Sequence, residues 1–234
     1  MGRPGRLALV ALAVVFAVAA EPTKEKPREA LKPFNDLVGS WKGTGVPEGT
    51  REERQRGFWS ETIAWEWQFK GDDAWMKATI KDGKYFTQAE LRPLAAANRF
   101  RLTVETPEKQ SLTFEGELQD RKLTLDRSDD KTKETQRITI RLLHSNRYTY
   151  QYDVKPEGKS LFVKKYQVGA TKEGEPFAAG GSGPECVISG GLGTIAVKFK
   201  DKTYYVCCTG CRDEFLSNPE KYVKEFEERK KKKN

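Results

Sequence analysis

Hydrophobic and polar residues alternate along much of the chain. From Ile63 to Phe69, large apolar side chains occupy every second position, with polar or small residues between them. This two-residue period is typical of a strand with one buried face. The same alternation recurs in Phe100-Leu102-Val104, Leu112-Phe114, Leu123-Leu125, Ile138-Ile140-Leu142 and Tyr148-Tyr150-Tyr152-Val154. No stretch between 59 and 168 keeps the 3.6-residue period of an amphipathic helix, so this region is predicted to be all β.

Short turn sequences separate these stretches, among them Asp82-Gly83, Asp129-Asp130 and the tripeptide at 156–158. Connections this short let consecutive strands pair as antiparallel neighbours. About nine or ten such strands indicate an up-and-down barrel or a sandwich. Closure into a barrel is favoured because it removes exposed strand edges. The predicted fold class is mainly β, with an antiparallel up-and-down barrel over residues 34–168.

A different pattern follows the predicted barrel. Residues 169–183 are rich in glycine and are expected to form a linker. In the small module predicted at 184–228, Ile195–Phe199 and Thr203–Val206 indicate a hairpin. A helix is expected to open at Cys211, with Phe215 and Leu216 on its inner face. Asn218 followed by Pro219 is typical of the start of a second helix, because asparagine caps helices and proline favours the first helical position.

The first twenty residues have the form of an export signal peptide. Arg3 and Arg6 precede an apolar run from Leu7 to Val18, and small residues at 17 and 19 fit a cleavage site. The run is short for a membrane span, so no transmembrane segment is expected after cleavage. The alternative is an uncleaved N-terminal anchor. The protein is therefore predicted to be exported, to the periplasm or the extracellular space.

The distribution of charge argues against a nucleic-acid partner. The formal net charge is +8, and removal of Arg3 and Arg6 with the signal lowers it to +6. Much of the excess lies at 229–234, which is expected to be a basic tail. Elsewhere acidic and basic residues alternate, whereas a nucleic-acid binder more often has a basic face with interleaved aromatics. Residues 21–33 are charged and contain two prolines, and are expected to be a linker.

All four cysteines lie between 186 and 211. Cys186 precedes the predicted hairpin, Cys207 ends it, and Cys211 opens the following helix, so three sulfur atoms can meet at one point. A module of about forty residues rarely folds by hydrophobic burial alone and usually needs disulfides or a metal. Because thiolates suit Cu(I) and Zn(II), these three cysteines are candidate metal ligands. Cys208 is left open as a further ligand.

Two alternatives to a metal site remain open. An exported protein can hold four cysteines as two disulfides, and a redox-active dithiol is the other option. For a metal, three thiolates complete a trigonal Cu(I) site, but structural zinc takes four ligands. The fourth ligand would be Cys208, Asp213, Glu185 or water. Cys208 is a less favourable fourth ligand, because the side chains of adjacent residues at a strand end are expected to point apart.

Two stretches of the chain resemble known families and add to the predictions for the barrel and the cysteine module. Gly39-x-Trp41, preceded by a short apolar turn from Phe34, resembles the entry motif of lipocalin-like barrels. The resemblance implies that residues 34–168 form such a barrel and that Trp41 packs across its closed end. It covers that region and depends on a short motif and the strand count.

The stretch from Thr203 to Tyr222 resembles the C-terminal half of a YHS domain. Twenty residues separate Cys186 from Cys207 and three separate Cys207 from Cys211, which resembles the related TRASH-type pattern. The resemblance implies a small metal-binding module, of the kind attached to heavy-metal transporters, sensors and exported proteins, with these three cysteines as ligands. The opening departs from the family pattern Asp-Pro-Val-Cys-Gly-Met, because residues 183–190 read GPECVISG. The missing methionine leaves the metal preference open.

The sequence shows no paired catalytic carboxylates, catalytic triad or phosphate-binding loop, and a non-catalytic protein is expected. The single histidine, His144, is a weak candidate for a haem ligand and is interpreted as a loop residue. The predicted activity is binding of a thiophilic metal ion, Cu(I), Zn or similar, for sequestration, delivery or structural support. The alternative is a small apolar ligand inside the barrel, with the cysteine module as a disulfide-stapled or purely structural appendage.

Overall fold

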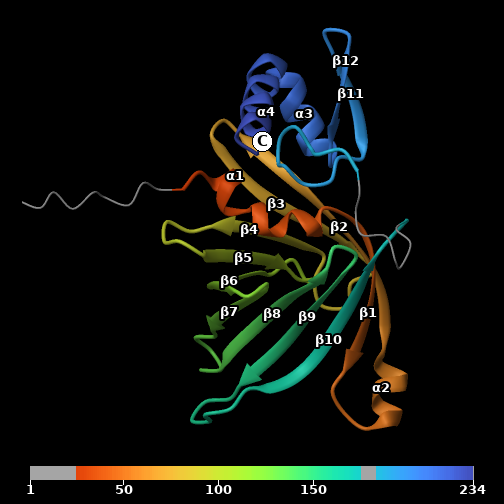
Figure 1. Cartoon of the computed structure of the whole chain (residues 1–234). Coiled ribbons are helices and arrows are strands. Elements are labelled where there is room, and N and C mark those ends of the chain that lie inside the picture. The colour runs from red at the N-terminus through yellow and green to blue at the C-terminus, as the bar shows by residue number, and fades with distance from the viewer. Residues whose placement is uncertain (1–24, 175–182, 234) are drawn as a thin grey trace, which may run out of the picture.

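The structure, a computed structural model, describes residues 25–174 and 183–233. Within them a closed antiparallel barrel carries a small C-terminal module at one end (Figure 1). The barrel strands follow one another around the barrel in sequence order, and β1 pairs with β10 to close it. The strands are β1 (Gly39–Pro47), β2 (Trp59–Lys70), β3 (Asp73–Lys81), β4 (Gln88–Pro93), β5 (Arg99–Glu105), β6 (Ser111–Gln119), β7 (Lys122–Ser128), β8 (Thr135–His144), β9 (Arg147–Lys155) and β10 (Val163–Lys172).

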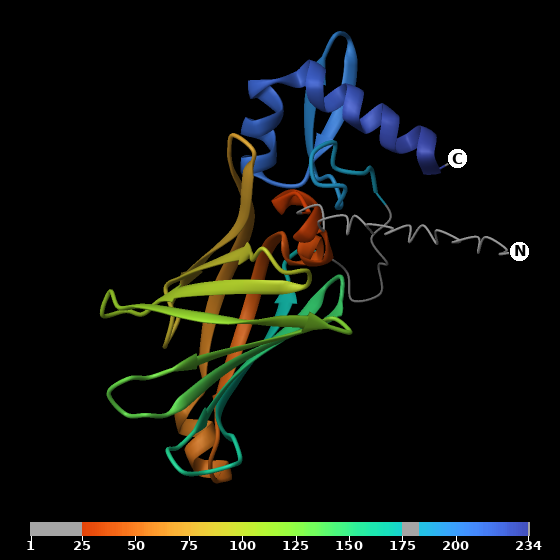
Figure 2. The same cartoon turned by 90° about the vertical axis from the view of Figure 1, so that its left-hand side faces the viewer.

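The C-terminal module consists of a hairpin and two helices, which lie together above the barrel in both views (Figures 1 and 2). Its elements are β11 (Ile195–Phe199), β12 (Lys202–Val206), α3 (Thr209–Ser217) and α4 (Pro219–Lys233). Three short helices belong to the barrel part: α1 (Pro27–Ala30), the 3₁₀ helix η1 (Lys32–Leu37) and α2 (Arg51–Gly57). The fold class predicted from the alternation, mainly β with an up-and-down barrel, is confirmed.

The inward positions of the barrel are those that the alternation indicates. In β2, Ile63, Trp65 and Trp67 are buried, with exposed fractions of 1%, 5% and 0%. Trp41 in β1 is fully buried, and its Nε1–H donates to the carbonyl of Leu37 over 2.7 Å. Large side chains thus fill the barrel and provide most of its hydrophobic stabilisation.

Several local expectations need correction. Within the linker proposed at 21–33, residues 27–30 form α1 and η1 begins at Lys32, and Leu31 and Phe34 are fully buried at the end of the barrel that faces the module. Strand β10 continues to Lys172, past residue 168. Helix α3 begins at Thr209, and Leu216 is 57% exposed, whereas its neighbour Phe215 is fully buried. The proposed signal peptide and residues 175–182 of the proposed linker lie outside the described residues.

A buried carboxylate lies inside the barrel wall. Glu61 is 3% exposed, and its two oxygens accept hydrogen bonds from Trp59 Nε1–H and from the Tyr150 hydroxyl, each over 2.7 Å. Burial raises the pKa of Glu61 above 4.5, although the two hydrogen bonds oppose the shift. Glu61 is in phase with Ile63 and Trp65, so the alternation places it on the inner face.

We expect Glu61 to make stability depend on pH. Because its pKa is higher in the folded chain, the protonated form favours folding, and this contribution is lost as pH rises from 4.5 through the folded pKa. The free energy of unfolding of the wild type, minus that of Glu61→Gln, should therefore fall as the pH rises above 4.5. Urea denaturation across this range measures the difference. A flat or rising difference would contradict the assignment, and exposed Glu117→Gln is the matched control.

Candidate metal centre

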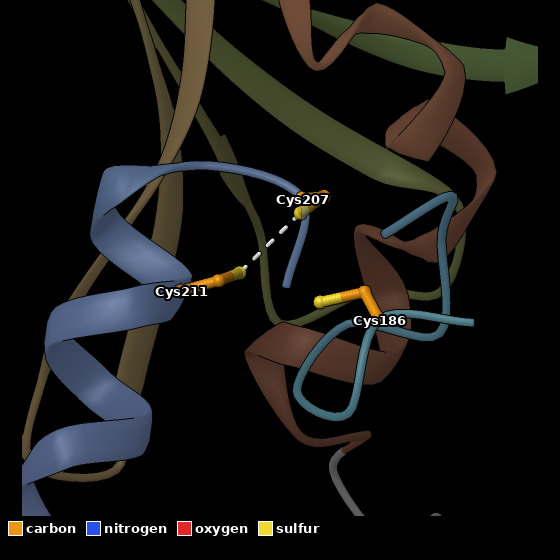
Figure 3. Close-up of side chains that lie close together, drawn as sticks. All are labelled: Cys186, Cys207 and Cys211. Atoms are coloured by element: carbon orange, nitrogen blue, oxygen red, sulfur yellow. Dashed lines mark hydrogen bonds between the residues drawn. The ribbon is translucent and has the colours of Figure 1, made fainter. Parts of the chain in front are cut away.

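Three cysteine side chains converge in the C-terminal module (Figure 3). The Sγ atoms of Cys186, Cys207 and Cys211 all lie within 4.8 Å of one another, and those of Cys207 and Cys211 are 3.5 Å apart. Cys186 and Cys211 are fully buried, and Cys207 is 8% exposed. The convergence expected from their positions around the hairpin is therefore observed, and the group could hold a metal ion.

Each cysteine comes from a different local structure. Cys207 follows the last residue of β12, and Cys211 lies in the first turn of α3. Cys186 lies in a tight loop in which its carbonyl accepts from Gly190 N–H over 3.0 Å. Gly190 has φ +79°, a conformation that favours glycine. In the same loop Ser189 N–H donates to Cys186 Sγ over 3.4 Å, which fixes the direction of that sulfur.

The sulfur separations fit a shared ion better than a disulfide. A tetrahedral ion with metal–sulfur bonds of about 2.3 Å holds its sulfurs about 3.8 Å apart. A disulfide bond is about 2.05 Å long. The 3.5 Å between Cys207 and Cys211 is close to the first value, and all four cysteines are free thiols in the structure. The three-sulfur donor set is one that thiophilic ions prefer.

The thiols of the cluster influence one another's ionisation. Hydrogen bonds from Cys207 and Cys211 lower the pKa of Cys186, whereas burial raises the pKa of Cys211. The protons of the cluster are therefore shared among interacting thiols. A bound cation would replace such protons, because thiols bind metals in the deprotonated form. Metal affinity should consequently increase with pH.

Cys208 also lies beside the cluster, contrary to the expectation that it points away. Its Sγ is 4.0 Å from Cys207 Sγ, and Cys208 is 8% exposed. Strand β12 ends at Val206, so the two cysteines lie in the turn into α3 rather than on opposite faces of a strand. Cys208 Sγ accepts from the backbone N–H of Trp67 in β2 over 3.3 Å.

The other proposed fourth ligands lie away from the sulfurs. No carboxylate or histidine of the described residues joins the group of mutually close ligand atoms. Glu185 instead lies 3.6 Å from Arg229 Nε, and the exposed Asp213 pairs with Arg212 over 3.0 Å. His144 is exposed and is the last residue of β8, paired with Arg147 of β9, so its interpretation as a loop residue was wrong.

The module packs directly on the edge of β2. Strand β1 pairs with β2 only from Trp65 toward Trp59, so beyond Trp65 no strand of the described residues pairs with β2 on that side. There Cys208 accepts from Trp67 N–H, and Thr209 Oγ1 donates to Glu66 Oε2 over 2.8 Å. Gly210 lies so close that a Cβ on it would be 1.7 Å from the Trp67 carbonyl oxygen. The cysteine loop therefore covers an otherwise unpaired strand edge.

Two further contacts support the cysteine loop. The side chain of Asn35 in η1 donates to the Ser189 carbonyl over 3.1 Å. From α4, Arg229 donates to the Val187 carbonyl over 2.8 Å, beside Cys186. Arg229 was expected in the basic tail, but α4 runs through it and its guanidinium supports the cysteine loop. The sequence gave no sign of this role, because Arg229 is the first of a run of basic residues.

A pocket at the junction of barrel and module reaches the cysteine cluster. Its volume is about 620 Å³, and Cys207 is among the lining residues. Asn35, Ser40 and Lys172 contribute polar groups to it. Cys207, which is 8% exposed, therefore borders this pocket.

The barrel interior is less suited to a ligand. An apolar cavity between Ile63, Trp65, Phe86 and Tyr150 has a volume of about 30 Å³. Pockets for small organic molecules usually have volumes of about 300–1,000 Å³. This cavity is therefore too small for such a ligand unless the surrounding side chains move.

The chain was compared with protein families, curated proteins and solved structures. No family model matches it, and no curated protein is similar to it. Among solved structures it resembles the S-type phycobiliprotein lyase CPES from Guillardia theta, with 10% sequence identity and a TM-score of 0.36. The match covers 62% of this chain and 94% of the lyase. A likeness this weak carries no conclusion about function.

The described helices were also examined for membrane spans. None of them combines the length and the apolar character that a crossing of the bilayer requires.

Proposed function

We propose that the protein binds a thiophilic metal ion, Cu(I), Zn or similar, through Cys186, Cys207 and Cys211. The observation that carries this proposal is the convergence of three buried sulfurs within 4.8 Å of one another. Cysteines of this burial, spacing and donor type are suited to soft and borderline ions. The resemblance of residues 203–222 to a YHS domain, and of the cysteine spacing to the TRASH-type pattern, supports the same ligand set.

The biological role that we propose is sequestration or delivery of the ion outside the cytoplasm, or structural support of the module. The N-terminal export signal supports an extracytoplasmic location. The pocket beside Cys207 favours exchange of the ion over a purely structural role, because one candidate ligand borders it. We propose that the protein is not an enzyme, since no histidine or carboxylate of the described residues joins the cysteine group and the sequence shows no catalytic motif.

A metal titration tests this proposal. The full chain, reduced and kept under anaerobic conditions, should bind one Cu(I) or one Zn(II) per molecule. Thiolate-to-metal absorption should increase up to that ratio and then stop. A shift to tighter apparent binding at higher pH is expected, because the thiols must lose protons. Absence of saturable binding of either ion would exclude the proposed function.

A further inference from the structure

We propose that Cys208 is the fourth ligand of the metal centre, which then becomes a four-thiolate site for Zn(II) and other tetrahedral ions. This inference rests on the metal-binding function proposed above and specifies its preferred ion. Zinc in structural sites is almost always four-coordinate, whereas Cys186, Cys207 and Cys211 provide three ligands. The identity of the fourth ligand therefore decides whether the centre suits zinc or a three-coordinate ion such as Cu(I).

The position of Cys208 is close to that of a tetrahedral ligand. Its Sγ is 4.0 Å from Cys207 Sγ, against about 3.8 Å between sulfurs around a tetrahedral zinc. Cys208 falls outside the group of sulfurs that are all within 4.8 Å of one another. Coordination therefore requires Cys208 Sγ and the other sulfurs to approach one another by about 1 Å or more.

Other donors near the cluster are poorer candidates. Among the described residues, no carboxylate or imidazole reaches the three sulfurs. Ser189 Oγ lies 3.4 Å from Cys207 Sγ, but a neutral hydroxyl is a hard ligand and competes poorly with a thiolate for a thiophilic ion. Cys208 is the remaining protein side chain of suitable chemistry beside the site.

The hydrogen bond from Trp67 is compatible with coordination. Hydrogen bonds to ligand atoms commonly orient metal ligands and tune the site. Trp67 N–H would hold Cys208 as Ser189 N–H holds Cys186, with N···S distances of 3.3 and 3.4 Å. Because Trp67 belongs to β2, the barrel would help to build the zinc site, and zinc binding would strengthen the attachment of the module to the barrel.

X-ray absorption at the zinc edge tests the coordination number on the unmodified full chain. We expect four sulfur ligands per zinc. In Cys208→Ser, Zn(II) affinity should fall by about tenfold or more, because loss of an outer hydrogen-bond partner alone costs about 10–100-fold. Cu(I) affinity should change less than about threefold, since three thiolates remain. Thr209→Ala is the control, because it removes the adjacent contact with Glu66 but no sulfur.

The possible results separate this inference from the proposed function. Four sulfurs on zinc, with a selective loss of zinc affinity in Cys208→Ser, support Cys208 as a ligand. Three sulfurs with an oxygen or nitrogen ligand, or equal zinc affinity in both proteins, would overturn it and leave the three-cysteine site intact. Failure of the unmodified chain to bind either ion would overturn both. The absorption measurement uses the unmodified chain, so its result remains valid even if Cys208→Ser folds poorly.

Discussion

Replacement of Cys211 by serine should abolish tight metal binding. Cys211 Sγ is fully buried, lies 3.5 Å from Cys207 Sγ, and is held by the first turn of α3. The hydroxyl of serine is a poor ligand for a thiophilic ion. A ligand at 1,000 times its Kd stabilises the folded state by about 4.1 kcal/mol. If the variant binds about 100-fold more weakly, the same ion concentration stabilises it by only about 1.4 kcal/mol.

Thermal or urea unfolding with and without the ion measures this loss. Asp213→Asn is a matched control, because Asp213 lies on the same helix, is exposed and pairs with the neighbouring Arg212. The control should keep the full stabilisation by metal. Equal stabilisation of Cys211→Ser and the wild type would show that Cys211 is not a ligand.

Replacement of Gly210 by alanine should detach α3 from the barrel. The new Cβ would lie 1.7 Å from the Trp67 carbonyl oxygen, which is backbone and cannot move aside without distorting β2. Overpacking of this kind costs about 1–3 kcal/mol, more than the 0.5–1 kcal/mol that alanine gains over glycine inside a helix. The bond between Trp67 N–H and Cys208 Sγ should be lost as well.

Hydrogen exchange at Trp67 N–H, together with urea denaturation, reports both effects. We expect lower stability and faster exchange at this amide in Gly210→Ala. Gly169→Ala is the control, because nothing lies within 4 Å of its added Cβ. Wild-type exchange at Trp67 in the Gly210 variant would argue against the tight packing of α3 on β2.

The parts of the fold that the sequence predicted are those governed by local pattern. A strict two-residue period from Ile63 to Phe69 can be satisfied only by a strand with one inner face, and short turns leave few ways to pair the strands. The cysteine cluster was predictable for the same reason. The hairpin pairs Ile195 with Val206, so the chain before it can return to Cys207, and the loop of Cys186 completes the approach.

The attachment of the module to β2 could not be predicted in this way. This attachment depends on where β1 stops pairing with β2. The pairing ends at Trp65, so β1 does not occupy the backbone N–H of Trp67, which donates to Cys208 Sγ. That register is set by the closed barrel as a whole, and no pattern in the local sequence indicates it. The same holds for Arg229, whose contact with the Val187 carbonyl joins residues 42 apart. By contrast, Glu61 could have been recognised, because it occupies an inward position of the alternation.

The measurement that tests the central claim most directly is a joint count of metal and free thiols. The protein would be prepared from its native compartment without added reductant, then analysed for metals and titrated with a thiol reagent before and after a chelator. We predict close to one Cu or Zn per chain, with at least three thiols protected until the chelator is added. Two disulfides and no metal would contradict the account and leave the cysteine module a covalent staple.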